Sequence, residues 1–112
     1  MQNDLSIHVK ITVERPGHTD EGSFGKGTAA LLEGVKEKGS LNRAAKDLGM
    51  AYSKAWRMLK DVEQNFGITF LERDGARGST LTAEGEKFLA FYKELDVKTT
   101  AYTMNLFKEH FN

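Results

Sequence analysis

Hydrogen-bond donors suited to nucleic acid are concentrated in one part of the sequence. Ser53, Lys54 and Arg57 lie close together, and the forked guanidinium of arginine matches the acceptor edge of guanine while hydroxyls can serve bases or phosphates. The segment from Lys36 to Lys60 contains seven basic and two acidic residues, a net charge of +5, so the rest of this neutral chain carries −5. Positive charge gathered in one segment is what phosphate binding requires. We therefore predict contact with double-stranded DNA.

Two helices joined by a tight turn would position these donors. Ser40 can cap a helix over residues 41–48, and Gly49 can end it, because glycine adopts positive φ without steric cost. Ala44 and Ala45 leave room for another helix to approach closely. A second helix over residues 51–66 would follow at once, which predicts a helix-turn-helix.

The second helix has a predicted buried stripe and an opposite, polar face. The stripe consists of Ala55, Leu59, Val62 and Phe66, widened by Met58 and by Trp56, which we assign to the core. The polar face carries Ser53, Lys54 and Arg57, with Tyr52 and Lys60 at its margins. Recognition helices read base edges near their N-termini, so Arg57 and Lys54 are the leading candidates. The alternative is an ordinary solvated basic face.

Flanking segments predict the rest of a winged helix-turn-helix, a mainly α fold with a small β-sheet. Residues 6–13 alternate apolar and polar side chains as in a half-buried strand, a loop covers residues 15–27, and a helix follows from residue 28 to Gly39. Beyond Gly67, two short strands around a glycine-rich tip predict a hairpin, the wing, in which Arg73 and Arg77 could touch DNA. The alternative is a plain surface hairpin. The predicted DNA-contacting residues are Ser40, Arg43, Tyr52, Ser53, Lys54, Arg57, Lys60, Arg73 and Arg77.

A long C-terminal helix, capped by Thr82, is expected to dimerise the protein. Its apolar positions follow alternating spacings of four and three residues, as in a coiled-coil seam. The seam consists of Phe88, Tyr92, Leu95, Thr99, Tyr102 and Leu106. We predict a homodimer and divide the chain into a DNA-binding domain, residues 1–81, and a dimerisation helix, residues 82–112. The alternative is a helix that folds back over its own domain.

Composition argues against other classes of protein. There is no cysteine, and the sequence lacks both an apolar run long enough to span a bilayer and a signal-peptide pattern, so we expect a cytoplasmic protein without membrane contact. His8, His18 and His110 are too scattered for a metal site or a nucleophile–base pair. His18 does lie near Asp20 and Glu21, but in a polar loop. We expect no enzymatic activity, metal or cofactor.

These features together resemble a known family. The stretches FGKGTAALLEGVKEKGS, AAKDLGMAYSKAW, LER and LTAEG, in this order, are similar to the N-terminal DNA-binding domain of ModE-type molybdate-responsive regulators and, more distantly, to LysR-type regulators. The strongest matches are Gly39, Ser40, Ala44, Ala45, Tyr52, Ala55, Trp56, Leu81, Thr82 and Gly85. The resemblance implies a winged helix-turn-helix that binds a roughly palindromic site as a homodimer.

The sequence does not specify how the protein is regulated, and it also fits one function other than DNA binding. ModE-type regulators carry a downstream region for the molybdate oxyanion, and we expect this chain, which ends at Asn112, to lack it. Either a separate effector or sensor protein supplies a signal, or the protein acts constitutively. The rival to DNA binding is a winged-helix protein-interaction module, with Tyr52 or Trp56 as anchors.

Overall fold

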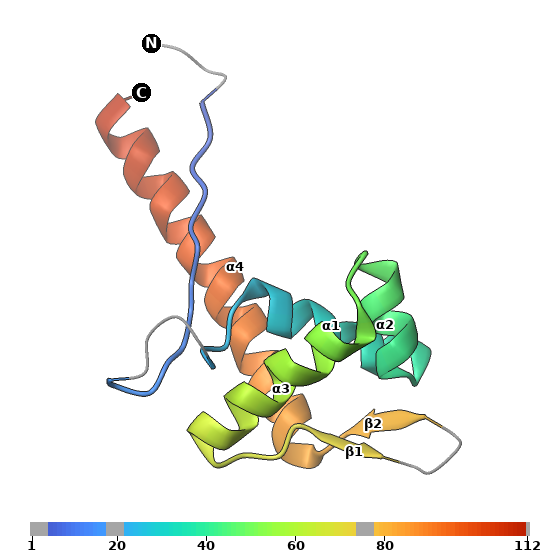
Figure 1. Ribbon diagram of the computed structural model, residues 1–112. Coiled ribbons are helices and arrows are strands. Elements are labelled where there is room, and N and C mark those ends of the chain that lie inside the picture. The colour runs from blue at the N-terminus through green and yellow to red at the C-terminus, as the bar shows by residue number, and fades with distance from the viewer. Residues whose placement is uncertain (1–4, 18–21, 74–77, 112) are drawn as a thin grey trace.

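The computed structural model describes residues 5–17, 22–73 and 78–111. Within these ranges, four helices and a two-stranded sheet follow one another along the chain: α1 (Lys26–Lys38), α2 (Leu41–Asp47), α3 (Tyr52–Phe66), β1 (Leu71–Arg73), β2 (Ser79–Leu81) and α4 (Ala83–Phe111) (Figure 1). The predicted fold class, a mainly helical winged helix-turn-helix with a small sheet, is confirmed. The three short helices form a compact body, and the sheet lies at one edge of it.

Local signals set the ends of the helix pair as predicted. The Ser40 hydroxyl accepts a hydrogen bond from the amide of Arg43 at 3.2 Å and so caps α2. Gly49 has a φ of 68°, a conformation that side chains with a β-carbon rarely adopt, and lets α3 begin at Tyr52. The tight turn therefore depends on Gly49.

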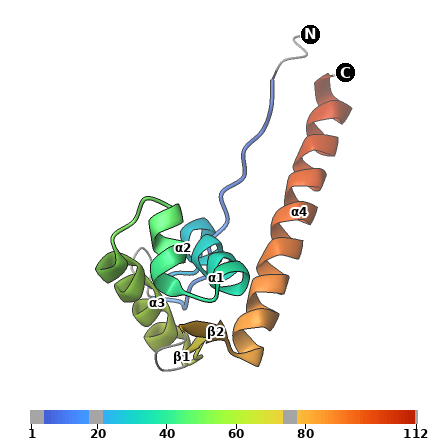
Figure 2. The ribbon, with the colours of Figure 1, turned by 90° about the vertical axis from the view of Figure 1, so that its right-hand side faces the viewer.

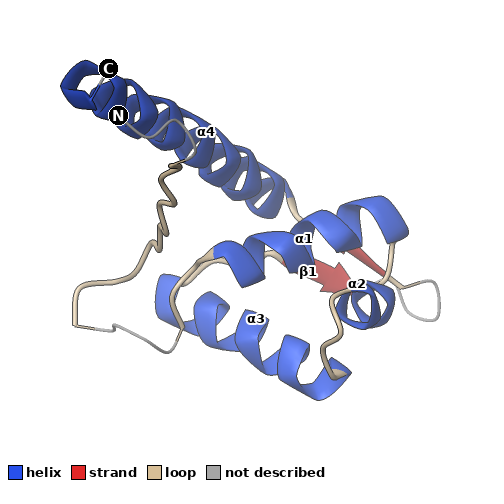
Figure 3. Ribbon diagram, turned by 90° about the horizontal axis from the view of Figure 1, so that it is seen from above, coloured by secondary structure: helices blue, strands red, loops and turns tan. Residues whose placement is uncertain are grey.

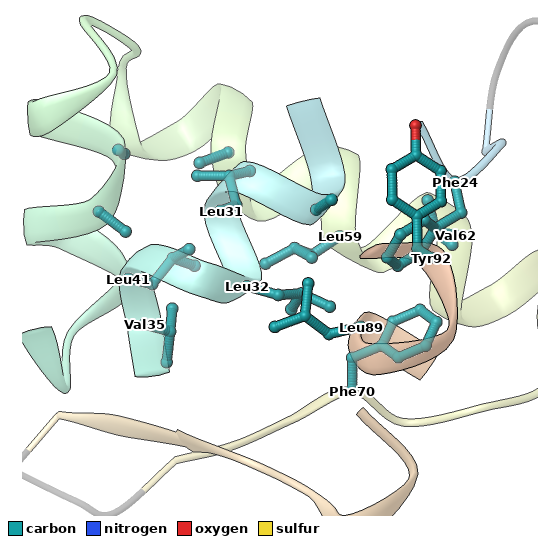
Figure 4. Close-up of a cluster of buried hydrophobic side chains, with 14 residues drawn as sticks. Phe24, Leu31, Leu32, Val35, Leu41, Leu59, Val62, Phe70, Leu89 and Tyr92 are labelled. Atoms are coloured by element: carbon teal, nitrogen blue, oxygen red, sulfur yellow. The ribbon is translucent and has the colours of Figure 1, made fainter. Parts of the chain in front are cut away.

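The core lies where the helices meet (Figure 4). Leucine and alanine side chains of α1, α2 and α3 fill its centre. At the other end, Phe24 packs against Phe70 at 5.6 Å between ring centroids and against Tyr92 at 5.2 Å. Tilted and edge-on aromatic pairs at these distances are favourable. Phe24 precedes α1, Phe70 precedes β1 and Tyr92 belongs to α4, so this cluster joins three distant parts of the chain.

The wing is an antiparallel pair of strands fixed to the helices at both ends. Leu71 pairs with Leu81, and Arg73 pairs with Ser79. The Ser79 amide donates to the Gly39 carbonyl at 3.0 Å, which joins β2 to the turn between α1 and α2. The hairpin predicted beyond Gly67 is confirmed for its described residues, and Arg77, at its predicted tip, lies outside them.

The N-terminal strand predicted over residues 6–13 is not formed. Val13 makes a single antiparallel bridge to Phe24, while residues 5–12 are extended without a neighbouring strand in the described parts of the chain. The alternation of half-buried and exposed side chains is nevertheless present. Side-chain alternation sets which face is buried, but a strand also needs a partner for its backbone groups. Here the Ile11 carbonyl accepts the Tyr92 hydroxyl at 2.7 Å instead.

The last helix, α4, begins under the wing and extends well beyond the body (Figure 2). The Thr82 hydroxyl caps it as predicted, accepting the Gly85 amide at 2.9 Å. Its buried residues, Gly85, Leu89 and Tyr92, all lie in the part from Ala83 to Tyr92, near the start of its 29 residues. The remainder stands outside the core, and the extended N-terminal segment runs from the same end of the molecule back toward the body, opposite to the chain direction of α4 (Figure 1).

Candidate nucleic-acid interface

The outer face of α3 carries the predicted donors. Ala55, Leu59 and Val62 are buried as predicted, and they hold the helix against the core. Ser53, Lys54 and Arg57 are exposed. Seen from above, α1 lies between α3 and α4, so the donor face is on the side of the body away from α4 (Figure 3). The helix can therefore approach a flat or grooved partner without obstruction from α4.

A polar groove separates the N-terminus of α3 from the wing. It has a volume of about 410 Å³ and is lined by Ser40, Leu41, Asn42, Tyr52, Arg73, Gly78 and Ser79. Inside it, Arg73 Nη2 donates to the Tyr52 hydroxyl oxygen at 2.5 Å. This bond sets the position of the Arg73 guanidinium relative to α3, and three hydroxyl-bearing residues lie around it. Such a set of donors fits a phosphate oxygen.

Lys60 is more constrained than the sequence indicated. Its ammonium lies 3.2 Å from a Glu63 carboxylate oxygen and 5.5 Å from the centre of the Trp56 ring. Glu63 also accepts, through Oε2, the amides of Phe70 at 2.7 Å and Leu71 at 3.3 Å. The carboxylate therefore ties the end of α3 to the start of β1 and partly neutralises Lys60.

Trp56 is not in the core, contrary to the prediction. Its side chain is 42% exposed, because it lies on the flank of α3 facing the wing and not on the stripe formed by Ala55 and Leu59. The Trp56 side chain is partly covered where α3 meets the wing, and Leu71 and Glu63 are among its neighbours there.

The other predicted contact residues divide into two groups. Tyr52 and Arg73 are exposed and hydrogen-bonded to each other, and Ser40 lines the same groove, so the structure brings these three together. Arg43 is exposed in the first turn of α2, next to Ser40. Sequence reasoning missed Asn42, which lines the groove, and Glu63, which positions the wing. The closeness of Asn42 to the capping serine was a usable signal, whereas nothing local distinguishes Glu63 from other helical glutamates.

The predicted dimer seam falls partly inside the chain's own core. Tyr92 is only 6% exposed, with its ring against Phe24, and Phe88 contacts the same cluster. These two residues serve the fold of the single chain, as in the alternative interpretation of the helix. Tyr102, at 69% exposed, and Leu106 lie on the projecting part of α4, where no described segment covers them. Leu95 and Thr99 are half-buried between the two regions.

Other kinds of site find no support in the described ranges 5–17, 22–73 and 78–111. No three histidine, aspartate or glutamate side chains gather there as a metal site would need. None of the helices in these ranges has the length and apolar character needed to cross a membrane. His18, Asp20 and Glu21 lie outside the described residues.

Comparisons with known proteins agree with this geometry. The model of a family described as "Bacterial regulatory helix-turn-helix protein, lysR family" matches residues 28–86. The "Molybdenum transport protein ModE" of Herbaspirillum seropedicae is 33% identical over 70 residues, which are 59% of this chain and 26% of that protein. The "DNA-binding transcriptional dual regulator ModE" of Escherichia coli K12 is 30% identical over 67 residues, 56% of this chain and 26% of the relative. The chain thus matches only 26% of the length of these curated relatives.

Solved structures resemble the fold as well. The structure described as "CbnR_DBD-DNA complex" aligns with a TM-score of 0.61 and 25% identity, over 76% of this chain and 95% of that one. The "BenM_DBD/benA site 1 DNA Complex" aligns with a TM-score of 0.57 and 26% identity, over 73% of this chain and 90% of that one. Both are DNA-binding domains bound to DNA.

Proposed function

Because the chain belongs to the lysR family of bacterial regulatory helix-turn-helix proteins, we propose that it is a transcriptional regulator that binds specific double-stranded DNA as a homodimer. In this proposal α3 enters the major groove, and the wing lies on the backbone or in the adjacent minor groove. Residues 1–81 form the DNA-binding part, on which the first turns of α4 pack, and the projecting remainder of residues 82–112 forms the dimerisation helix. Such a regulator would act in the cytoplasm and need no catalytic chemistry.

The observation that carries the proposal is the face of α3. Ser53, Lys54 and Arg57 are exposed on it, while Ala55 and Leu59 hold the opposite side in the core. A helix anchored this way presents its donors from a fixed backbone, so the ordering cost of binding is confined to the side chains. The forked guanidinium of an exposed arginine such as Arg57 suits bidentate contact with guanine, and Lys54 and Ser53 suit bases or phosphates. The charge of +5 between Lys36 and Lys60 supports the same partner.

The wing groove supplies the second part of the proposed interface. Ser40, Tyr52 and Arg73 meet there, with Tyr52 hydrogen-bonded to Arg73. We assign this group to one backbone phosphate beside the major groove. Arg43 would reach a neighbouring phosphate, and Lys60, held by Glu63, would strengthen binding only modestly. Phosphate contacts of this kind fix the register of α3 without reading sequence.

Selection of bound duplexes from a random oligonucleotide pool tests the proposal. We expect an enriched motif with two inverted halves about one helical turn apart, since a two-fold dimer places two copies of α3 at that spacing. A pool with no enriched motif, together with no retention of DNA at low salt, would exclude DNA binding. The exposed Trp56 and Tyr52 would then favour the protein-interaction alternative.

A further inference from the structure

Trp56 is an unusual residue to leave exposed on the flank of a helix. It is the only tryptophan in the chain, and 42% of its surface is accessible. Large aromatic side chains that remain exposed beside a row of hydrogen-bond donors are typical of binding surfaces. Packing against Leu59 and Leu71, where α3 meets the wing, explains why part of the Trp56 side chain is buried. It does not explain why the rest is exposed.

The position of Trp56 places it between the two parts of the proposed interface. It lies one turn after Tyr52 and one turn before Lys60, so these three side chains form a row along the wing side of α3. Arg57, the next residue along the chain, belongs to the outward face. Lys60 lies over the indole ring at 5.5 Å and is held there by Glu63. These contacts restrain the indole on one side and leave the rest of it exposed to a partner.

We propose that Trp56 is a specificity-determining residue, which makes an apolar contact with the C5-methyl group of a thymine in the major groove. This inference rests on the proposed function, because it requires α3 to lie in that groove. The thymine methyl is the apolar group that base edges present in the major groove, and an indole beside donors that face base edges is suited to it. Trp56 would thus select an A·T pair next to the bases read by Arg57.

The test compares thymine with uracil in the selected duplex. Wild-type protein is titrated, by fluorescence anisotropy, into the labelled duplex and into a copy with every thymine of one half-site replaced by uracil. We expect the uracil copy to bind about fourfold more weakly for each thymine methyl group that packs against Trp56. Trp56→Ala is expected to bind both copies with equal affinity, and Gln64→Ala, an exposed control on the same helix, is expected to keep the wild-type preference.

Two further readouts separate this role from a structural one. Tryptophan emission of the wild type reports on Trp56 alone, and we expect quenching, with reduced access to acrylamide, when the duplex binds. Trp56→Phe retains a smaller aromatic ring and should keep part of the preference for thymine. Circular dichroism checks that this variant is folded. If Trp56→Ala still prefers thymine, or if emission does not respond to DNA, the contact with thymine is refuted although DNA binding stands. If the wild type selects no duplex at all, the proposed function fails, and this contact fails with it.

Discussion

Gly34 of α1 lies so close to Ala44 of α2 that a β-carbon on Gly34 would be 2.6 Å from the β-carbon of Ala44. Real β-carbons do not approach each other so closely, so the crossing of these two helices requires a glycine at this position. The crossing matters for the interface, because α2 fixes the turn from which α3 begins. The small size of Gly34 and Ala44 is therefore a condition for the placement of Arg57.

Replacing Gly34 with alanine is expected to destabilise the protein. The added methyl group overpacks the crossing, and we expect a loss of about 1–3 kcal/mol in the free energy of unfolding, measured by urea denaturation. Gly27→Ala, in the same helix, is the matched control. There the added carbon would lie 3.3 Å from the flexible end of Met58, so we expect little change. Equal effects of the two substitutions would contradict this explanation of the crossing.

Removing the carboxylate of Glu63 is expected to loosen the wing. In Glu63→Ala the amides of Phe70 and Leu71 lose their acceptor, which should cost about 1–3 kcal/mol. Amide hydrogen exchange measures the effect directly, and the amide of Phe70 should exchange faster than in the wild type. Glu72→Ala, an exposed glutamate on β1, serves as the control. Unchanged protection of Phe70 in Glu63→Ala would refute the proposed link.

Tyr92 should make the protein sensitive to alkaline pH. Burial raises the pKa of the Tyr92 phenol above its usual value of 10, and the nearby Asp96 carboxylate adds to this increase. The folded state therefore holds the phenolic proton more tightly than the unfolded state. The resulting stability is fully present below pH 10 and falls as the pH rises through the raised pKa.

Unfolding of Tyr92→Phe, followed in urea at several pH values between about 7 and 11, tests this dependence. At neutral pH the variant should lose about 1 kcal/mol, because the Ile11 carbonyl loses its hydrogen bond. Above pH 10 its stability should fall less steeply than that of the wild type. Parallel curves for Tyr92→Phe and wild type would argue against this role of the phenol.

The helix-turn-helix could be predicted because its determinants are local. Ser40 as a cap, Gly49 as a turn and the apolar spacing of α3 all act within a few residues, and the structure has them as expected. The donor face of α3 follows from the same periodicity. For this reason the exposure of Ser53 and Arg57 could be predicted without any knowledge of the rest of the chain.

The features that sequence reasoning missed depend on distant partners. Residues 6–13 show the alternation of a strand, but only Val13 finds a strand-like partner, in Phe24. Trp56 lies beside the apolar stripe in sequence, yet its flank meets the wing and not the core. The bond between Tyr52 and Arg73 likewise joins separate elements. Periodicity specifies which face a side chain occupies, and it does not specify what the fold places opposite that face.

Two substitutions should separate base reading from phosphate contact. Arg57→Ala is expected to lose about 1–3 kcal/mol of preference for the selected motif over unrelated DNA. Arg73→Ala, in the wing groove, should weaken binding to all duplexes alike and reduce the salt dependence of binding. Anisotropy titrations at several salt concentrations measure both quantities. If Arg57→Ala weakens specific and unrelated duplexes equally, Arg57 contacts phosphate and does not read bases.

The Tyr52 hydroxyl is expected to affect DNA binding through its hydrogen bond to Arg73. In Tyr52→Phe the guanidinium loses the bond that orients it, so we expect affinity to fall roughly threefold to tenfold for all duplexes, the value of one ordinary hydrogen bond. If Tyr52 acts only in this way, adding Tyr52→Phe to Arg73→Ala should have no further effect. An additive loss in the double variant would instead indicate that the Tyr52 hydroxyl contacts DNA independently of Arg73.

The projecting part of α4 should hold two copies of the chain together. Tyr102 and Leu106, which share one side of the helix, leave an apolar surface that the described residues of one chain do not cover, whereas Leu89 and Tyr92 are already buried. Burying such a surface in a second copy would be favourable. Tyr102→Glu places a charge in the proposed interface and is expected to weaken dimerisation roughly thirtyfold, measured by sedimentation equilibrium. Thr100→Glu introduces the same charge on the other side of the exposed helix, so its dimerisation should change little. A wild-type chain that sediments as a monomer at high concentration would refute the homodimer.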